Sequence, residues 1–591
     1  MARRHVRALA AGAVLLLLAA CDGRPPDDGI VKHQDLTGSF VPQPVVTKDP
    51  GRDGPAPQVE GATPGGTITV YLPGAPGPDT LDPTGGWSVT GNAILQGLVS
   101  RSLTQYARGE DGQPVLVPDL ATDLGHHNDD FTRWTFTIRT DATWEDGSPV
   151  TAEEVAFGIC RSLDAEAFPG GPGAEYSRTY FAGSEDYLGP YTDDDPGCDD
   201  WSGIEVHGQD ITISMSRPFP DMDFWGASMA MGPAPLGEAS DPSAYGHAPL
   251  ASGPYEVKRW SPGEQLVLVR NEEWSASSDP ARHQYADEWV FKFNQDQDVV
   301  DEIMLSGSTA GRRAVSTSLG AGRFTDASSR LGERLVQQSS PCVASIAPDY
   351  TRITDIRVRK ALAYAYPYED AWLAGGDVPD VTRVPASSLL PPGVAGRRDY
   401  QVDGEQITYD PARSRALLAE AGHGDEPYPI TMAYYDLDQR ARDAQDQITT
   451  GFEAGGFSVK AIPLQESPYD VWLDPDDEVN QTLDIRGSNW CPPWPTGAAM
   501  LPPLLKPGAA YNTAHFDEPA VTEEMERIAT LPAKEQPGAW GELDERIMKT
   551  WFPIIPTGYV NRLFVFGDHV GNPAGDGSTG TPDYKDLYVV R

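Results

Sequence analysis

The sequence predicts an α/β fold of two or three lobes. About 570 of the 591 residues remain once a leader is removed, which is too long for a single hydrophobic core. Segments with the periodicity of strands and of helices mix irregularly along this length, with no repeat at a fixed period. The hydrophobic content of 39%, with 14 Trp and 23 Tyr, suits both globular cores and a pocket lined by aromatic rings.

The first 20 residues predict a signal peptide. Three arginines lie before an apolar stretch from Ala8 to Ala20, which is too short to anchor stably across a bilayer. Cys21 follows at once, and this pattern resembles the bacterial lipobox, in which the cysteine carries a diacylglycerol and becomes the new N-terminus. We expect a lipid on Cys21 that holds the protein at the outer face of the cytoplasmic membrane. The alternative is an ordinary secretory signal followed by a chance cysteine.

Residues 21–65 predict a flexible linker behind the lipidated cysteine. They are rich in Pro, Gly and Asp and show no sustained periodicity. Order is expected from residue 66, because residues 66–72 alternate like a strand. No later stretch approaches the roughly 20 apolar residues of a spanning helix. We therefore expect the lipid to be the only contact with the membrane.

The remaining elements follow from periodicity and from capping residues. Alternation of polar and apolar side chains predicts strands at residues 134–139, 211–215 and 265–270. Thr151 and Glu154 form a capping box at the start of a helix. Further helices are expected at residues 355–365, at 411–421 just before Gly422, and as a pair across 520–549.

The charge of the chain argues against some partners. It contains 87 Asp and Glu against 45 Lys and Arg, a formal net charge of -42. Such a surface repels nucleic acid and anionic lipid head groups. We expect neither as a partner, and we expect a monomer whose acidic surface keeps it in solution.

Four cysteines remain once Cys21 is lipidated, namely Cys160, Cys198, Cys342 and Cys491. An even number in an exported chain predicts two disulfides. Four cysteines allow three pairings, and their spacing does not choose between them. There is no Cys-x-x-Cys, which argues against a zinc ribbon or a redox-active pair.

The search for catalytic motifs finds almost nothing. The chain has no Gly-x-Ser-x-Gly elbow, no His-Glu-x-x-His and no phosphate-binding loop. His126 and His127 are adjacent, but a metal site requires more ligands at defined spacing, so we favour a solvated hairpin. We expect no catalytic residue, no metal and no cofactor, and we expect that the protein is not an enzyme.

Ordered blocks along the mature chain resemble family 5 of the extracellular solute-binding proteins of ABC importers, a family that includes oligopeptide, dipeptide and nickel receptors. The blocks are residues 81–83 (LDP), 116–121 (LVPDLA), 134–139 (WTFTIR), 142–149 (ATWEDGSP), 151–155 (TAEEV), 252–255 (SGPY), 355–362 (DIRVRKAL) and 409–422 (YDPARSRALLAEAG). The resemblance rests on all of them in order, since each alone is a turn, a bend or a packing element.

The resemblance implies a periplasmic-binding-protein-like fold of type II, in its large cluster. Two α/β lobes are joined by a hinge, an extra domain is inserted into the first lobe, and the ligand is enclosed between the lobes as they close. The implied domains are lobe I (66–99, 236–341 and 560–591), the inserted domain II (100–235) and lobe II, or domain III (342–559).

The segment 487–495 resembles the stretch that lines the cleft of peptide receptors in that family. Those receptors typically have Trp-Cys-Ala-Asp-Tyr there, and the Asp pairs with the ammonium group of the peptide. Trp490 and Cys491 match, but Pro493 stands where the Asp is expected and offers neither charge nor N–H. This substitution weakens the prediction of a peptide with a free amino group, because a buried ammonium would lack its partner. A neighbouring carboxylate remains an alternative partner.

The resemblance also implies two disulfides and a set of binding residues. Its oligopeptide receptors join the Cys of this segment to one just before the block at 355–362, which implies Cys342–Cys491 and leaves Cys160–Cys198. The candidate ligand-binding residues are Asn489, Trp490, Cys491, Trp494, Trp87, Tyr435 and Tyr469, with Trp472 as an alternative to Tyr469. Outside the 487–495 segment, core packing explains each aromatic residue at least as well as ligand contact.

The sequence thus predicts an extracytoplasmic substrate-binding lipoprotein of an ABC importer, which captures an oligopeptide or another small solute and delivers it to the permease. Two alternatives remain: an exported hydrolase on the same scaffold, and a signalling or chaperone-like lipoprotein that takes no part in transport.

Overall fold

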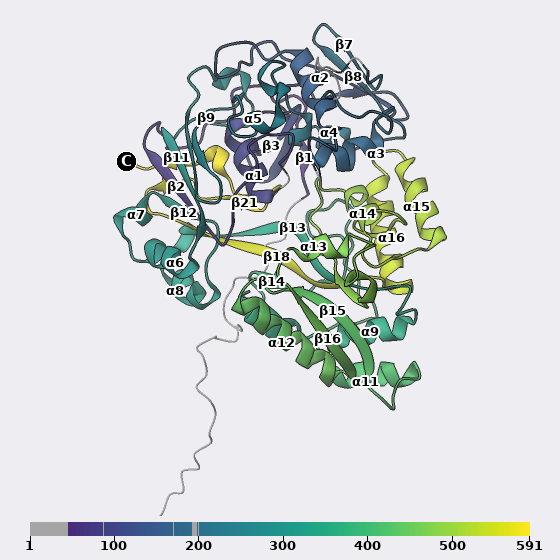
Figure 1. Ribbon diagram of the computed structural model, residues 1–591. Helices are drawn as coiled ribbons and strands as arrows, with labels where there is room; N and C mark the ends of the chain where they lie inside the picture. Colours follow the sequence, from purple (N-terminus) through teal and green to yellow (C-terminus); the bar gives the residue numbers. More distant parts are fainter. Residues whose placement is uncertain (1–44, 87, 170, 192–197, 199) are drawn as a thin grey trace, which may run out of the picture. The chain divides into compact units, whose positions relative to one another are not determined.

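One continuous mixed sheet runs through both lobes (Figure 1). The computed structural model describes residues 45–86, 88–169, 171–191, 198 and 200–591, so Cys21 and Trp87 lie outside the described residues. The strands follow one another across the sheet in the order β16 (Phe457–Leu464), β15 (Tyr428–Tyr435), β17 (Ile485–Gly487), β13 (Leu335–Pro348), β18 (Ile555–Phe566), β12 (Ala314–Ser316), β2 (Thr67–Pro73), β11 (Glu288–Gln295), β10 (Gln265–Arg270) and β9 (Tyr255–Ser261), and β14 (Arg383–Val384) pairs with β18.

Two long antiparallel strands, β13 and β18, connect the lobes. Their pairing is regular from Leu335 to Ser339, shifts before Val343, and shifts again between Ala344 and Ser345. Such bulges bend a strand and increase its twist. The predicted domain boundaries, at 341/342 and 559/560, fall within these two strands. We call β13 and β18 the hinge strands.

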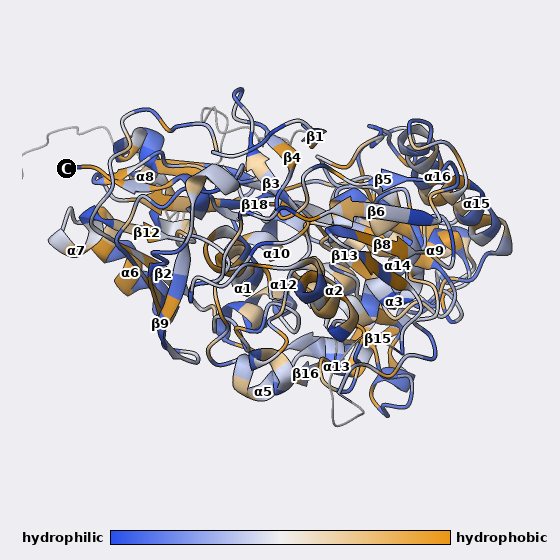
Figure 2. Ribbon diagram, turned by 90° about the horizontal axis from the view of Figure 1, so that it is seen from above, coloured by the Kyte–Doolittle hydropathy of each residue, from blue (hydrophilic) through white to orange (hydrophobic). Residues whose placement is uncertain are grey.

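The helices cover the two ends of this sheet. Lobe I carries α6 (Gln297–Leu305), α7 (Thr309–Arg312) and α8 (Phe324–Arg330). Lobe II carries α9 (Ile356–Ala365), α10 (Tyr368–Ala374), α11 (Pro411–Glu420), α12 (Gln439–Ala454), α14 (Leu501–Leu505), α15 (Pro519–Ala529) and α16 (Gln536–Thr550). The helices predicted at residues 355–365, 411–421 and 520–549 are present as α9, α11, α15 and α16. In Figure 2, α14 has apolar colours, and its three leucines are all buried.

The range predicted as domain II, residues 100–235, contributes to two small sheets with strand orders β1-β4-β3 and β5-β6-β8-β7, and β1 comes from the segment before it. These strands are β1 (Thr47–Lys48), β3 (Thr104–Arg108), β4 (Pro114–Pro118), β5 (His126–His127), β6 (Arg133–Thr137), β7 (Ile204–His207) and β8 (Asp210–Ser214). We keep the names lobe I, domain II and lobe II for the predicted residue ranges. Both histidines of β5 are exposed. The predicted capping box is present at α2 (Ala152–Arg161), where Thr151 accepts a hydrogen bond from the backbone of Glu154 and the Glu154 side chain accepts one from Thr151.

The last part of the predicted linker lies against the folded body. Thr47 and Lys48 form β1, which pairs with β4 in parallel, and Val46 and Ala56 are buried. Lys48 also forms an ion pair of 2.5 Å with the buried Asp223. This contact could not be predicted from the composition of residues 45–65. Two buried apolar residues and one ion pair leave no periodic pattern in a sequence.

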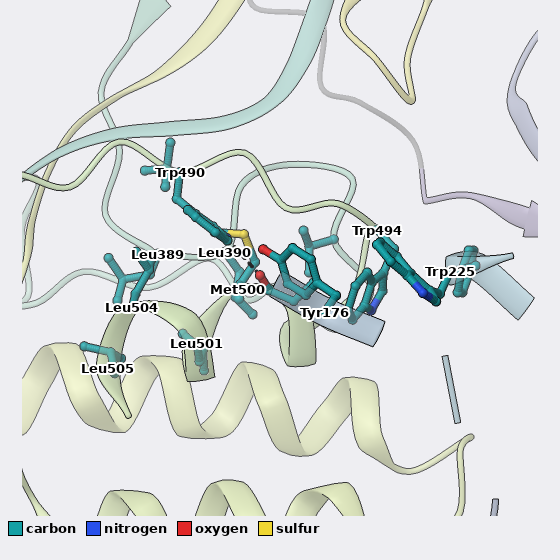
Figure 3. Close-up of a cluster of buried hydrophobic side chains, with 14 of the residues drawn as sticks. Tyr176, Trp225, Leu389, Leu390, Trp490, Trp494, Met500, Leu501, Leu504 and Leu505 are labelled. Atoms are coloured by element: carbon teal, nitrogen blue, oxygen red, sulfur yellow. Dashed lines mark hydrogen bonds between the residues drawn. The ribbon is translucent and has the colours of Figure 1, made fainter. Parts of the chain in front are cut away.

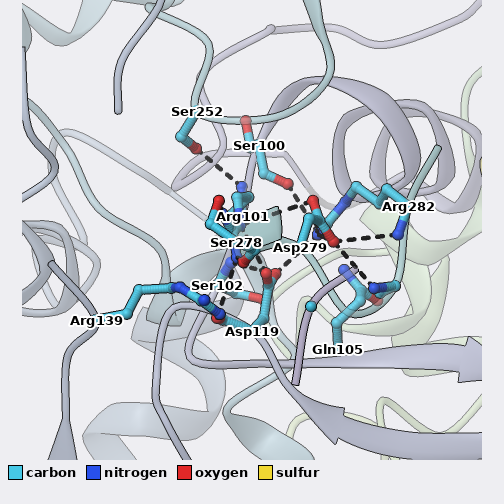
Figure 4. A network of polar contacts seen from close by, with 12 residues as sticks. Ser100, Arg101, Ser102, Gln105, Asp119, Arg139, Ser252, Ser278, Asp279 and Arg282 are labelled. Carbon is cyan, nitrogen blue, oxygen red and sulfur yellow. Dashed lines mark hydrogen bonds and ion pairs between the residues drawn. The ribbon is translucent and has the colours of Figure 1, made fainter. Parts of the chain in front are cut away.

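Buried ion pairs attach domain II to lobe I. Arg161 of α2 donates two hydrogen bonds, of 2.8 and 2.7 Å, to the carboxylate of Asp82, which explains why the LDP segment carries an acidic residue. A second network joins Arg101 and Asp119 to Arg282, with distances of 2.7 Å from Arg101 to Asp119 and 3.0 Å from Arg282 to Asp119 (Figure 4). Such pairs specify a single docking geometry when every polar atom finds a partner.

The structure contains both disulfides that the resemblance implies. Cys160 joins Cys198, and Cys342 joins Cys491. Cys342 lies within the irregular part of hinge strand β13, so its disulfide fixes the segment around Cys491 to the hinge. No helix in the described part of the chain is long and apolar enough to cross a membrane.

The carboxyl group of Asp544 on α16 is fully buried and has neutral partners. It accepts hydrogen bonds from the hydroxyls of Ser388 and Tyr400, at 2.7 and 2.8 Å, and from the backbone N–H of Leu389 at 3.1 Å. Burial outweighs these bonds and raises the pKa of Asp544 to about 6. In the unfolded chain an Asp titrates near 4, so between these values the folded state binds the extra proton.

We therefore expect Asp544 to lower the free energy of unfolding as the pH rises from 4 to 7. Its stabilising protonated form is fully present below about pH 4 and is lost as the pH passes about 6, a change of about 2 to 3 kcal/mol. Asp544→Asn should remove this contribution, whereas Asp446→Asn on the exposed face of α12 should not. Denaturant unfolding of each variant at pH 4.5 and 7.5 measures the difference. Parallel behaviour of wild type and Asp544→Asn would contradict the assignment.

Candidate functional site

A cavity of about 440 Å³ lies where domain II, lobe I and lobe II meet at the hinge strands. Its volume is in the range of small-molecule sites, and its walls combine aromatic rings with a few polar groups. Its described lining residues are Gly86, Val89, Asn92, Gln96, Tyr106, Pro172, Phe224, Trp225, Ala227, Ser228, Met229, Ser340, Pro341, Cys342, Tyr469, Leu473, Asn489, Trp490, Cys491, Pro492, Pro493, Tyr511, Arg562, Ser578 and Thr579.

The segment that follows β17 is held against the hinge by its backbone. Trp490 and Val343 exchange two backbone hydrogen bonds, of 2.9 and 3.0 Å, and the side-chain oxygen of Asn489 accepts one from the N–H of Ser345 at 3.0 Å. The disulfide from Cys491 to Cys342 adds a covalent link at the same place. The segment is therefore a fixed wall of the cavity, set by the irregular pairing of β13.

The indole ring of Trp490 is fixed by contacts of its own, in addition to those of the Trp490 backbone. Its indole N–H donates to the carbonyl of Ala499 at 2.8 Å, and its ring lies 4.6 Å from that of Tyr511. Tyr469 donates its hydroxyl to the carbonyl of Asn489 at 3.0 Å, and burial raises its pKa to about 12. Both rings present rigid, neutral surfaces to the cavity.

Domain II supplies the opposing aromatic wall. Phe224 and Trp225 come from the short helix α4 (Met222–Trp225), and Tyr106 stacks on Phe224 with centroids 6.4 Å apart. Trp494 lies behind this wall and does not line the cavity; its ring lies 5.6 Å from that of Trp225 and 5.4 Å from that of Tyr176 (Figure 3).

Two acidic groups of the α4 segment, Asp221 and Asp223, are already engaged. Asp221, at the start of α4, accepts hydrogen bonds from the indole of Trp494 at 2.8 Å and the hydroxyl of Thr496 at 2.6 Å. These bonds connect domain II to lobe II. Asp223 pairs with Lys48. Burial raises the pKa of both carboxyl groups. Neither Asp lines the cavity.

A second cavity of about 450 Å³ adjoins the first within lobe II, since Tyr469 and Asn489 line both. Tyr435 and Trp472 lie in its wall. Gly487 allows Trp472 to pack closely, because a Cβ at this glycine would come within 2.4 Å of the indole ring.

The structure places most of the sequence-predicted binding residues at these cavities. Asn489, Trp490, Cys491 and Tyr469 line the first, and Tyr435 lines the second. Trp494 lies behind the wall, and Trp87 lies outside the described residues. Pro493 lines the cavity, so the position expected to hold an acidic residue does face this space.

Sequence reasoning missed the contributions of domain II and of the hinge strands. Trp225 and Phe224 precede a Gly in an unremarkable segment, and only the tertiary fold brings them to the cavity. Arg562 did leave a signal. It is a lone cation in the apolar strand IPTGYVNRLFVF, where a charged side chain requires a reason. It is also the one charged side chain among the described lining residues.

The arrangement is suited to enclosing a solute between aromatic walls. Within the described residues there is no group of three or more His, Cys, Asp or Glu that would hold a metal ion. Cys342 and Cys491, the two cysteines among the described lining residues of the first cavity, are joined in a disulfide.

Comparison with known proteins identifies the family. The family model for bacterial extracellular solute-binding proteins, family 5, matches residues 115–512. The periplasmic oligopeptide-binding protein OppA of Escherichia coli is 23% identical over 504 residues, which cover 81% of this chain and 86% of OppA.

Solved structures agree in fold. A clavulanic acid biosynthesis oligopeptide-binding protein aligns with a TM-score of 0.78 at 23% identity, over 92% of this chain and 99% of its own. The ABC transporter substrate-binding protein CtaP of Listeria monocytogenes aligns with a TM-score of 0.67 at 18% identity, over 90% of this chain and all of its own. With a family model that covers most of its length and this shared fold of periplasmic-binding-protein type, the chain belongs to family 5 of the bacterial extracellular solute-binding proteins, which are binding proteins and not enzymes.

Proposed function

We propose that this protein is the extracytoplasmic substrate-binding lipoprotein of an ABC importer, and that it captures an oligopeptide or another small solute for delivery to the permease. The observation that carries the proposal is the cavity at the hinge strands, whose walls come from both lobes and from domain II. A ligand in this position contacts all three parts at once. It therefore favours the conformation in which they are close together.

Two further observations support the proposal. The related OppA is by name an oligopeptide-binding protein, and CtaP is by title a substrate-binding protein of an ABC transporter. The cavity at the hinge strands, of about 440 Å³, has the size of a site for a small ligand. The closed conformation is the signal that the membrane subunits recognise, and the binding protein itself performs no chemistry.

Binding at this cavity predicts a specific role for Trp490. Native mass spectrometry of the protein from its own host should reveal a retained small molecule, and intrinsic tryptophan fluorescence then measures the affinity. Trp490→Ala should weaken binding by about 10-fold or more, because the ring is a rigid buried anchor. Trp551→Ala, at a half-buried position of lobe II that lines neither cavity, serves as the control and should leave affinity unchanged. Equal affinity in both variants, or chemical conversion of the ligand, would contradict the proposal.

The lipid anchor makes a separate prediction. Metabolic labelling with a clickable fatty acid should mark the wild-type protein and leave it in the membrane fraction. Cys21→Ala should be exported without label and released into the soluble extracytoplasmic fraction, with ligand affinity unchanged. Membrane retention of unlabelled Cys21→Ala would show that the protein is held by something other than this lipid.

A further inference from the structure

Arg562 occupies an unusual position on the hinge. It lies in the middle of β18, a strand of the central sheet, opposite Gln338 of β13. Every other residue of β18 is buried or half-buried, whereas the side chain of Arg562 is exposed and lines the first cavity. The exposure of Arg562 is therefore exposure to the space enclosed by the lobes, beside the irregular turn of hinge strand β13 that contains Cys342.

The guanidinium of Arg562 has no partner. It makes no hydrogen bond or ion pair with any residue that the structure describes, although the nearby Arg383 is paired with Asp377 at 2.9 Å. Burial among protein atoms lowers the pKa of Arg562, and the charge of Arg383 lowers it further, against a smaller opposite effect of Asp377. An arginine nevertheless remains charged at neutral pH, so this is an uncompensated cation in a confined space.

The rest of the described lining offers no negatively charged side chain to a cationic ligand. The other described lining residues are apolar, aromatic or neutral polar groups, and Pro493 stands where the family resemblance leads one to expect a carboxylate. Asp221 and Asp223 of the α4 segment do not line the cavity and are engaged with Trp494, Thr496 and Lys48. The charge of the described lining is therefore positive, which favours a ligand with a negatively charged group.

We propose that Arg562 binds a carboxylate of the ligand, and that the cavity selects solutes that carry a carboxylate and bury no ammonium group. The class includes peptides recognised at their C-terminal end and N-acylated amino acids or peptides. The guanidinium fork matches a carboxylate with two parallel hydrogen bonds. This inference rests on the proposed function, since it names the substrate class of the same site.

A single carboxylate fits better than a phosphate or a polyanion. One guanidinium neutralises one negative charge, and no second unpaired cation lines the described part of the cavity. The formal net charge of -42 also repels multiply charged anions as they approach. Because Arg562 is on a strand that both lobes share, the bound carboxylate is held at the hinge itself, while the aromatic walls contact the rest of the ligand.

The test compares end groups. Pools of di- to tetrapeptides are prepared in four forms, with the N-terminus free or acetylated and the C-terminus free or amidated, and binding to the mature protein is measured by equilibrium dialysis and mass spectrometry. Benzoate and inorganic phosphate are measured as simple probes. The variants are Arg562→Gln and, as a control of equal charge change, Arg133→Gln, whose exposed side chain pairs with Glu205 on the surface of domain II.

For the wild type and the control we expect free acids to bind on the order of 10- to 100-fold more tightly than amides, the effect of one charge-assisted pair. Acetylation of the N-terminus should change affinity by less than about 3-fold, and benzoate should bind more tightly than phosphate. In Arg562→Gln the preference for acids over amides should disappear. Equal binding of acids and amides by the wild type, dependence on a free amine, preference for phosphate, or an acid preference that survives in Arg562→Gln would each overturn the inference.

Two outcomes separate this inference from the proposed function. If all four end-group forms bind equally, the protein is a solute receptor and only the carboxylate assignment fails. If no pool and no simple carboxylate binds, the carboxylate assignment fails together with the oligopeptide part of the proposed function. The ligand-free melting temperature provides a check on folding: Arg562→Gln should match or exceed the wild type, because it removes an unpaired cation beside Arg383. A marked decrease would assign Arg562 a structural role instead.

Discussion

The pairing of the two hinge strands, β13 and β18, is the constraint on which the rest of the structure depends. These strands carry the central sheet from one lobe to the other, and their pairing is interrupted at Ser340, Pro341 and Cys342. The interruption leaves these three residues outside the ladder between β13 and β18. The interruption turns this stretch toward the cavity and gives Val343 its contact with Trp490.

Domain II has two interfaces, a tightly bonded one with lobe I and a less extensively bonded one with lobe II. Domain II is attached to lobe I by buried networks, with Arg161 on Asp82 and Arg101 and Arg282 on Asp119, so we regard these two parts as one unit. The contact between domain II and lobe II has fewer polar interactions, namely the hydrogen bonds that Asp221 accepts from Trp494 and Thr496. Motion about the hinge strands would therefore separate lobe II from the other two parts and open the cavity between them.

Local features were predictable from sequence, and the assembly of the site was only partly so. The capping box at Thr151 and the helix stop at Gly422, whose φ is +90°, are set by neighbouring residues and were found where expected. Trp490 and Cys491 were identified because their segment resembles a known motif. Phe224 and Trp225 were missed because they reach the cavity only through the docking of domain II. Lys48 and Val46 show that a segment of linker-like composition still packs when it meets a complementary surface.

The cavity at the hinge is proposed to hold the carboxylate of a solute on Arg562. A crystal structure of the protein with the small molecule that it retains from its host provides the decisive test. We expect a carboxylate about 2.7 to 3.2 Å from the guanidinium of Arg562, with the rest of the ligand between Trp490 and Trp225. A ligand that turns an ammonium or an apolar group toward Arg562, or that binds outside this cavity, would contradict it.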